Sequence, residues 1–234
     1  MRVPKTNRTI EGAWDAQQWL EENPEIPPQL RNILSNYYKN HGRDFPWRRT
    51  KDPYMILVAE MLLQKTGVKP VENVWSAFIQ RYPNIEALSA ASIQDISSII
   101  GMLGLQKRAK LLHETAQRIF KETGGRIIAD AKFLESLPGV GKYSTAAVLS
   151  FAFNINAATL DVNAARVYTR IGGFSPNTLR QGLAFACIFS EQVNTAETHR
   201  EVNYGLLDLA AQVCKPKPLC DICPARRICH FALT

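Results

Sequence analysis

The chain has 234 residues, of which 46% are apolar and 21% charged, and its net charge is +7. This composition is typical of a folded globular protein and excludes an intrinsically disordered chain. No apolar run approaches the roughly 20 residues of a membrane span, and the first residues lack the apolar segment of a secretory signal, so we expect a cytoplasmic protein without membrane contact. The positive charge favours a polyanionic partner only slightly over a mildly basic soluble domain.

Helical spacing of apolar residues recurs along the chain, and the alternation expected of strands is nearly absent. Residues 54–66 predict a mostly buried helix. In residues 93–103, the apolar residues expected on one helical face are Ile96, Ile99, Ile100 and Leu103. In residues 107–122, the corresponding face comprises Ala109, Leu112, Ala116, Ile119 and Phe120. The pair Gly124-Gly125 is expected to end that helix. These patterns predict an all-α fold class.

Glu60 is the one charged residue in the apolar stretch YMILVAEMLL. A buried carboxylate is costly unless it is paired with a cation or kept protonated. A structural salt bridge is the simpler interpretation, and an acid with a raised pKa is the functional one. Gln64 follows one helical turn later on the same face.

The stretch LPGVGKYSTAAVLS, residues 137–150, predicts a tight turn between two helices. Glycines at positions 139 and 141 let backbone N–H groups approach a partner closely, and Lys142 begins the second helix. The positive end of a helix behind such a turn can bind a phosphate. An ordinary connection between two helices is equally consistent with this stretch alone.

Asp161 stands directly before the helical run VNAARVYTR. Aspartate is among the favoured residues at a helix N-cap, because its carboxylate accepts hydrogen bonds from the first backbone N–H groups. Taken alone, the residue is therefore interpreted as a cap.

Four of the five cysteines form a C-terminal box with the spacing Cys214-x5-Cys220-x2-Cys223-x5-Cys229. In a reducing compartment such a box is more consistent with a metal site than with disulfides. Structural zinc usually has two close cysteine pairs, whereas one close pair with two longer arms favours a [4Fe–4S] cluster over zinc. The fifth, Cys187, lies in an apolar helical run and is expected to be a buried small hydrophobe.

Together, the LPGVG hairpin, an aspartate about 20 residues downstream and the cysteine box resemble the helix-hairpin-helix DNA glycosylases. The similarity runs from about Arg43 to Cys229 and points to the endonuclease III and MutY branch, which carries an iron–sulfur cluster. The first cysteine gap has five residues where that family usually has six.

The resemblance implies a two-lobed all-α fold with a C-terminal iron–sulfur cluster loop. Residues 53–157 would form a helical barrel domain that ends in the helix-hairpin-helix. Residues 1–52 would form an N-terminal arm and helix that pack with the second lobe. That lobe, residues 158–234, would carry the catalytic aspartate and the cluster.

The resemblance also implies the catalytic residues. Asp161 would stabilise the positive charge that builds on the deoxyribose as the base departs, and would guide the water. The stretch VAEMLLQKT resembles the MutY-type SEVMLQQT, which implies that Glu60 is the acid toward the departing base or the residue that holds the water. Tyr143 occupies the place where bifunctional members have a lysine that forms a Schiff base, so we expect hydrolysis without strong AP-lyase activity.

The expected partner is double-stranded DNA with a mismatched or damaged base, bound by a monomer at the nucleoid. Gln64 and Leu105 match positions that enter the duplex near the flipped nucleotide. The hairpin residues expected to approach phosphates are Gly139, Val140, Gly141 and Lys142. The cluster would order a basic loop, in which some cations are expected to be solvated surface charges only. The candidate phosphate contacts in that loop are Lys215, Lys217, Arg226 and Arg227.

The favoured substrate is thymine or uracil opposite guanine, because the short thymine glycosylases that act on G/T mismatches end after the cluster and have tyrosine at the place of Tyr143. The alternative is a minimal MutY-like adenine glycosylase acting on adenine opposite guanine or 8-oxoguanine, since Gln64 is more MutY-like. A third hypothesis is a non-catalytic iron–sulfur DNA-binding protein, which would not need both Glu60 and Asp161.

Overall fold

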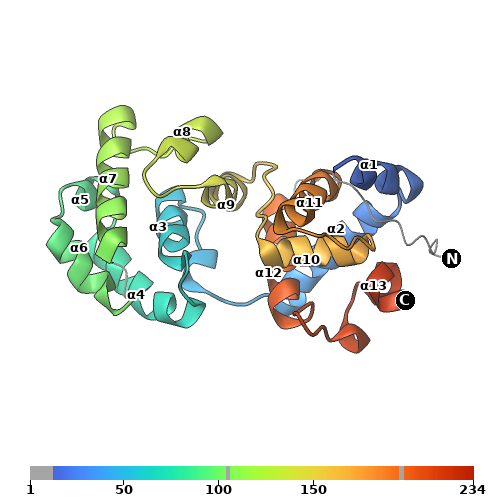
Figure 1. Ribbon diagram of the computed structural model, residues 1–234. Coiled ribbons are helices and arrows are strands. Elements are labelled where there is room, and N and C mark those ends of the chain that lie inside the picture. Colours follow the sequence, from blue (N-terminus) through green and yellow to red (C-terminus); the bar gives the residue numbers. More distant parts are fainter. Residues whose placement is uncertain (1–12, 104–105, 195–197) are drawn as a thin grey trace. The chain divides into compact units, whose positions relative to one another are not determined.

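The computed structural model describes residues 13–103, 106–194 and 198–234, and every regular element in these ranges is a helix (Figure 1). The α-helices are α1 (Ala13–Glu22), α2 (Ile26–His41), α3 (Pro53–Leu63), α4 (Val68–Arg81), α5 (Ile85–Ser89), α6 (Ile93–Ile100), α7 (Gln106–Thr123), α8 (Ala131–Ser136), α9 (Lys142–Phe153), α10 (Val162–Ile171), α11 (Leu179–Val193), α12 (His199–Gln212) and α13 (His230–Leu233). Short 3-10 turns are η1 (Pro46–Arg48), η2 (Gly101–Leu103), η3 (Cys220–Ile222) and η4 (Arg226–Ile228). The predicted all-α fold class is confirmed. Among the described helices, none combines the length and apolar character needed to cross a membrane.

The chain divides into two compact units. The hairpin unit is Asp44–Ile155, and the cysteine unit combines Met1–Arg43 with Asn156–Thr234. The units divide after residues 43 and 155. The sequence-based prediction placed these boundaries after residues 52 and 157. Helices from both ends of the chain therefore share the core of the cysteine unit.

Helix α3 is buried along nearly its whole length in the hairpin unit, where it packs against α4 and α9. The Asp52 carboxylate caps its start by accepting hydrogen bonds from the N–H groups of Tyr54 and Met55. Predicted to extend to residue 66, the helix ends at Leu63. The prediction was wrong there: the backbone leaves the helical region at Gln64, with a ψ of 118°, and Lys65 after it adopts a left-handed φ of 55°.

Helix α7 follows its predicted pattern with one exception. The buried positions of its predicted face are Ala109, Leu112, Ala116 and Ile119. Phe120, the fifth predicted position, is 44% exposed, so its expected place in the core was wrong. Gly124 and Gly125 end the helix as predicted, with φ values of 63° and 84° that glycine adopts without steric cost.

The cysteine unit is built around the crossing of α2 and α12. Gly205 of α12 lies against the backbone of α2, because a Cβ at this position would be 2.0 Å from the carbonyl oxygen of Leu34. On the same helix, Asp208 is fully buried and accepts hydrogen bonds from Arg43, 3.0 Å from the backbone N–H and 2.5 Å from Nε. Close packing and the pairing of a buried carboxylate with Arg43 thus fix α12 in this unit.

Cys187 of α11 is exposed, so its interpretation as a buried small hydrophobe was wrong. Helix α11 buries the face that carries Phe185 and Phe189. At about 100° per residue, position 187 lies far around the helix from both phenylalanines. An apolar run alone does not reveal which of its positions turns outward.

The Gly205→Ala variant tests the close crossing of α2 and α12. A methyl group there has no room unless the helices separate, so we expect the free energy of unfolding to fall by at least about 2 kcal/mol. Gly101→Ala is the matched control, because Gly101 has right-handed φ and ψ and no atom within 4 Å of the added Cβ. Urea unfolding of both variants measures the difference, and equal stabilities would contradict the proposed contact.

Candidate active site

The predicted hairpin lies between α8 and α9. Gly139 has a φ of 75°, and a Cβ there would also lie 3.1 Å from the Leu111 side chain. Val140 is buried, and its N–H donates to the Leu137 carbonyl at 3.1 Å. Gly141, the N-cap of α9, and Lys142 are exposed. The backbone that faces solvent at the positive end of α9 is therefore that of the last two hairpin residues.

Gln64 joins the end of α3 to this hairpin. Its Nε2 donates to the Gly139 carbonyl at 2.8 Å and lies 3.4 Å from Ser144 Oγ. The Arg108 guanidinium, almost fully buried, donates to the carbonyls of Leu62 and Gln64 and to the hydroxyl of Thr66. Sequence reasoning missed Arg108, which satisfies the carbonyls that the helix end leaves without partners. Leu105, predicted beside Gln64 on the DNA, lies outside the described residues.

Glu60 is 7% exposed within α3, and burial raises its pKa to about 7. The nearby charge of Arg48 acts in the opposite direction and lowers this pKa, but burial outweighs it. Arg48 is itself buried in η1, with its guanidinium 5.2 Å from the centre of the Phe45 ring. Each interpretation of Glu60 from the sequence is therefore partly right. A cation is near, as a salt bridge would require, and the pKa is raised, so that the acid keeps its proton to near neutral pH.

Tyr143 is the second residue of α9 and is half-buried, whereas Lys142 before it is exposed. One helical residue turns the side chain by about 100°, so these two neighbours face different directions. Glu60 and Tyr143 belong to the hairpin unit, and Asp161 belongs to the cysteine unit.

Asp161 is the N-cap of α10, as the sequence predicted. Its Oδ1 accepts hydrogen bonds from the N–H groups of Asn163 and Ala164, at 2.9 and 2.8 Å. Its Oδ2 accepts a third hydrogen bond, at 2.7 Å, from the side-chain amide of Asn163. Both oxygens are thus held in place, while the residue remains half-buried.

Hydrogen bonds continue from Asp161 to the cysteine box. Asn163 Oδ1 accepts from Arg166 Nη1 at 2.9 Å, and Arg166 Nε donates to the carbonyl of Cys214 at 2.8 Å. Arg166 Nη2 donates to the carbonyl of Ala210 at 3.2 Å. Sequence reasoning missed Asn163 and Arg166, although their three-residue spacing places them on one face of α10.

The four cysteines of the box are free thiols, three half-buried and Cys229 buried. Arg170 Nη1 lies 3.4 Å from Cys214 Sγ, and Cys229 Sγ donates to the Arg170 carbonyl at 3.5 Å. The pKa of Cys229 is raised to about 11, mainly by burial and in smaller part by the charges of Cys214 and Cys223. Burial and the neighbouring Cys214 and Cys220 also raise the pKa of Cys223. The four thiols therefore sit close enough to oppose one another's ionisation.

This donor set fits a metal group that binds through sulfur. A bound cation removes the mutual repulsion of four thiolates, and soft thiolate ligands suit iron–sulfur clusters and zinc. Within the described ranges, no three His, Cys, Asp or Glu side chains form a group that could hold one metal ion. The residues fit a thiolate-bound group by the chemistry of their donor atoms.

The cations of the cysteine box differ in their surroundings. Lys215, Lys217 and Arg227 are exposed. Arg226 is exposed too, but its Nη1 lies 3.0 Å from the carboxylate of Asp221. Exposed ion pairs contribute little to stability, so this pair competes with a phosphate contact without preventing it.

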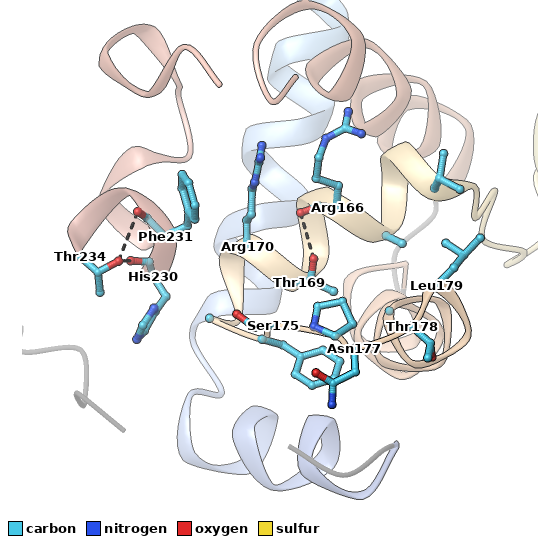
Figure 2. Close-up of a pocket in the computed structure, with 16 residues that line it drawn as sticks. Arg166, Thr169, Arg170, Ser175, Asn177, Thr178, Leu179, His230, Phe231 and Thr234 are labelled. Carbon is cyan, nitrogen blue, oxygen red and sulfur yellow. Dashed lines mark hydrogen bonds between the residues drawn. The ribbon is translucent and has the colours of Figure 1, made fainter. Parts of the chain in front are cut away.

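A groove of about 700 Å³ runs along α10 within the cysteine unit (Figure 2). Its walls come from α10, the turn before α11 and the C-terminal helix α13. Arg170 crosses it with its guanidinium 4.8 Å from the centre of the Phe231 ring and donates to the carbonyls of Lys215 and Pro216. Asp161 does not line the groove, so the groove is not the site of the predicted catalytic carboxylate.

Comparison with known proteins identifies the family. A model of the HhH-GPD superfamily base excision DNA repair proteins matches residues 58–186. The thymine/uracil-DNA glycosylase of Pyrobaculum aerophilum is 37% identical over 212 residues, which cover 87% of this chain and 91% of that protein. The thymine-DNA glycosylase of Aeropyrum pernix is 39% identical over 86% of this chain and 93% of its own length.

Human adenine DNA glycosylase is 31% identical over 86% of this chain but only 39% of its own length. The solved structure of a thermostable thymine-DNA glycosylase matches with a TM-score of 0.83 at 33% identity, over 90% of this chain and 98% of that one. The chain therefore belongs to the HhH-GPD superfamily of base excision DNA repair proteins. DNA glycosylase activity follows from this membership.

The raised pKa of Glu60 predicts how stability depends on pH. Between the ordinary pKa of 4.5 and the folded value of about 7, the folded protein holds a proton that the unfolded chain releases. Stability must therefore fall as pH rises through this range. We expect Glu60→Gln to be more stable than the natural protein at pH 8, by up to about 3 kcal/mol, and only slightly so at pH 5.

Thermal unfolding at the two pH values measures this difference. Glu135→Gln serves as the control, because Glu135 is an exposed carboxylate of the same unit. The prediction is wrong if Glu60→Gln changes stability equally at pH 5 and pH 8.

Proposed function

We propose that the protein is a monofunctional mismatch DNA glycosylase that removes thymine or uracil opposite guanine by hydrolysis. The observation that carries this proposal is the Asp161 carboxylate, held at the start of α10 by three hydrogen bonds. Loss of a base leaves positive charge on the deoxyribose, and a fixed carboxylate beside that sugar stabilises it without reorganising.

Glu60 supplies the second role. An acid with a pKa of about 7 is present in both protonation states near neutral pH. Its protonated form can donate to the departing base, and its ionised form can hold the attacking water. Arg48 keeps this pKa from rising further, because its positive charge favours the ionised carboxylate.

Tyr143 supports hydrolysis rather than strand cleavage. A Schiff base needs an amine, and a phenol at this position of α9 cannot form one. Lys142 is exposed at the positive end of α9, where its charge suits a phosphate. The protein therefore releases a base and leaves an abasic site, with no strong AP-lyase activity.

DNA binding uses surfaces of both units. In the hairpin unit, the exposed Gly141 and Lys142 bind phosphate, and the turn at Gln64 reaches the space near the flipped nucleotide. In the cysteine unit, the exposed cations of the cysteine box bind the backbone. The protein acts as a monomer on duplex DNA in the cytoplasm.

The choice of base rests on similarity. The two archaeal relatives named for thymine match over more than nine-tenths of their own length, whereas the human adenine enzyme matches over 39%. Adenine opposite guanine or 8-oxoguanine is the second candidate, because adenine DNA glycosylases are also similar and the stretch with Gln64 resembles the MutY-type pattern. A mismatch lowers the cost of base extrusion by a few kcal/mol at most, so pocket contacts must supply the remaining selectivity.

The four thiols of the cysteine box would hold a [4Fe–4S] cluster, with zinc as the alternative. Cys214 and Cys229, at the two ends of the loop, would both be ligands of this cluster and would be linked through it when it is bound. Hydrogen bonds within the chain connect this loop to Asp161. Arg166 donates both to the carbonyl of Cys214 and to the side chain of Asn163, which in turn orients Asp161. The cluster has a structural role in this proposal and takes no part in the hydrolysis.

A panel of duplexes that differ at one base pair tests the function. We expect G/T and G/U duplexes to lose thymine or uracil faster than adenine leaves from pairs with guanine or 8-oxoguanine, under single-turnover conditions. The product strand should stay intact until it is heated in alkali, and borohydride should trap no covalent complex. Asp161→Asn keeps the helix cap but loses the charge, so base release should fall at least about 100-fold while DNA binding stays near normal.

Other outcomes would each contradict a named part of the proposal. Faster adenine release would assign the chain to the adenine glycosylases, and a trapped complex would overturn the monofunctional mechanism. Full activity of Asp161→Asn would reduce that residue to a helix cap. Release of no base from any duplex would favour the non-catalytic DNA-binding protein.

Metal analysis tests the cluster. Anaerobically purified protein should contain about four irons per chain. Cys223→Ser should lose iron and unfold at lower temperature, whereas Cys187→Ser should keep both, because Cys187 is exposed and outside the box. Stoichiometric zinc without iron would end the iron–sulfur proposal and leave the four-thiolate site.

A further inference from the structure

A buried side-chain amide holds the backbone that leads to Asp161. Asn203 of α12 is fully buried, and so is Thr159, two residues before Asp161. Asn203 Oδ1 accepts hydrogen bonds from both the backbone N–H and the hydroxyl of Thr159, each at 3.2 Å. Its Nδ2 donates to the carbonyl of Ala157 at 3.0 Å. One side chain thus satisfies three polar groups of a segment that has no helical hydrogen bonds of its own.

The chemistry of this contact requires an amide. A backbone N–H can only donate and a carbonyl can only accept, so the partner needs an acceptor toward Thr159 and a donor toward Ala157. Asparagine supplies both from one planar group, and the two backbone partners fix which way that group points. Aspartate lacks the donor, and glutamine places the same group one methylene further from α12.

Helix α12 is itself a fixed support for this amide. Gly205, two residues on, packs directly against the Leu34 carbonyl, and Asp208 is paired with Arg43. At its end, the N–H of Cys214 donates to the Leu209 carbonyl at 2.8 Å, so the first cysteine of the box continues from the same helix. Asn203 therefore anchors the segment before Asp161 to a helix that is held closely against α2.

We propose that Asn203 is a positioning residue for the Asp161 carboxylate. Residues that follow Asp161 in the chain hold it through hydrogen bonds: Asn163 donates to its carboxylate, and Arg166 donates to Asn163. Asn203 holds the backbone that precedes Asp161, through its hydrogen bonds to Ala157 and Thr159. The inference rests on the proposed function, because Asn203 would act only through Asp161. Its own side chain is fully buried and would not contact the DNA or the base.

The expected effect is on the chemical step. A displacement of about 1 Å of a catalytic group can cost about 100-fold in rate, while ground-state binding through remote phosphates is unaffected. Releasing the segment before Asp161 should therefore lower the single-turnover rate constant at saturating enzyme by about 10- to 100-fold. The dissociation constant for DNA should change by less than about 3-fold, because the exposed cations are unaltered.

Two variants separate the hydrogen bonds from the filled space. Asn203→Leu keeps a similar volume and removes all three hydrogen bonds, and Asn203→Ala removes the volume as well. Leu206→Ala is the matched control, because Leu206 is a fully buried residue of the same helix whose truncation leaves a cavity in the core. Each variant is assayed well below its melting temperature for base release from a G/T duplex, and for binding to a duplex that carries an abasic-site analogue.

The inference predicts slow base release with near-normal binding in both Asn203 variants, and a normal rate in Leu206→Ala despite its lower melting temperature. Equal rates in Asn203→Leu and Leu206→Ala, with Asp161→Asn inactive, would overturn the positioning role and leave the proposed function standing. An active Asp161→Asn would instead overturn the assignment of the catalytic carboxylate. Loss of binding in parallel with rate would show that Asn203 supports the unit as a whole, which also contradicts the inference.

Discussion

The hydrogen bonds that the Asp161 carboxylate accepts at the start of α10 are the constraint on which the proposed chemistry depends. A helix start leaves N–H groups without partners, and a carboxylate that binds them is fixed in both position and direction. Arg166 extends the same set of bonds to the cysteine box, and Asn203 holds the chain that arrives at Asp161. In the proposed mechanism, the structural and catalytic demands on this residue therefore coincide.

The properties of Glu60 come from burial rather than from hydrogen bonds. Hydrogen bonds fix Asp161, whereas loss of water around Glu60 raises its pKa to about 7, with Arg48 limiting the rise. These different surroundings suit the two carboxylates to the different roles that the proposed function gives them. The cost is stability at alkaline pH, because the folded protein must then hold a charge in an apolar helix. Natural proteins often accept such a cost at sites of function.

Three places in the two units show where a local sequence pattern predicts the structure and where packing decides it. Glycines at 124 and 125 ended α7 as predicted, because positive φ depends on the residue itself. The end of α3 depends on Arg108, which is distant in sequence and binds the carbonyls at the turn. The exposure of Cys187 depends on which face α11 buries, which composition does not specify. Such errors arise wherever a partner comes from elsewhere in the chain.

The sequence alone determined the all-α fold class, the N-cap at Asp161 and the gathering of four thiols in one loop, because each depends on residue type and short spacing. The order of its motifs also identified the family. Tertiary structure decided the pKa of Glu60, which depends on how completely other helices exclude water. It also decided the partners of Asn203 and Arg166, since hydrogen bonds between distant segments exist only after the helices have packed.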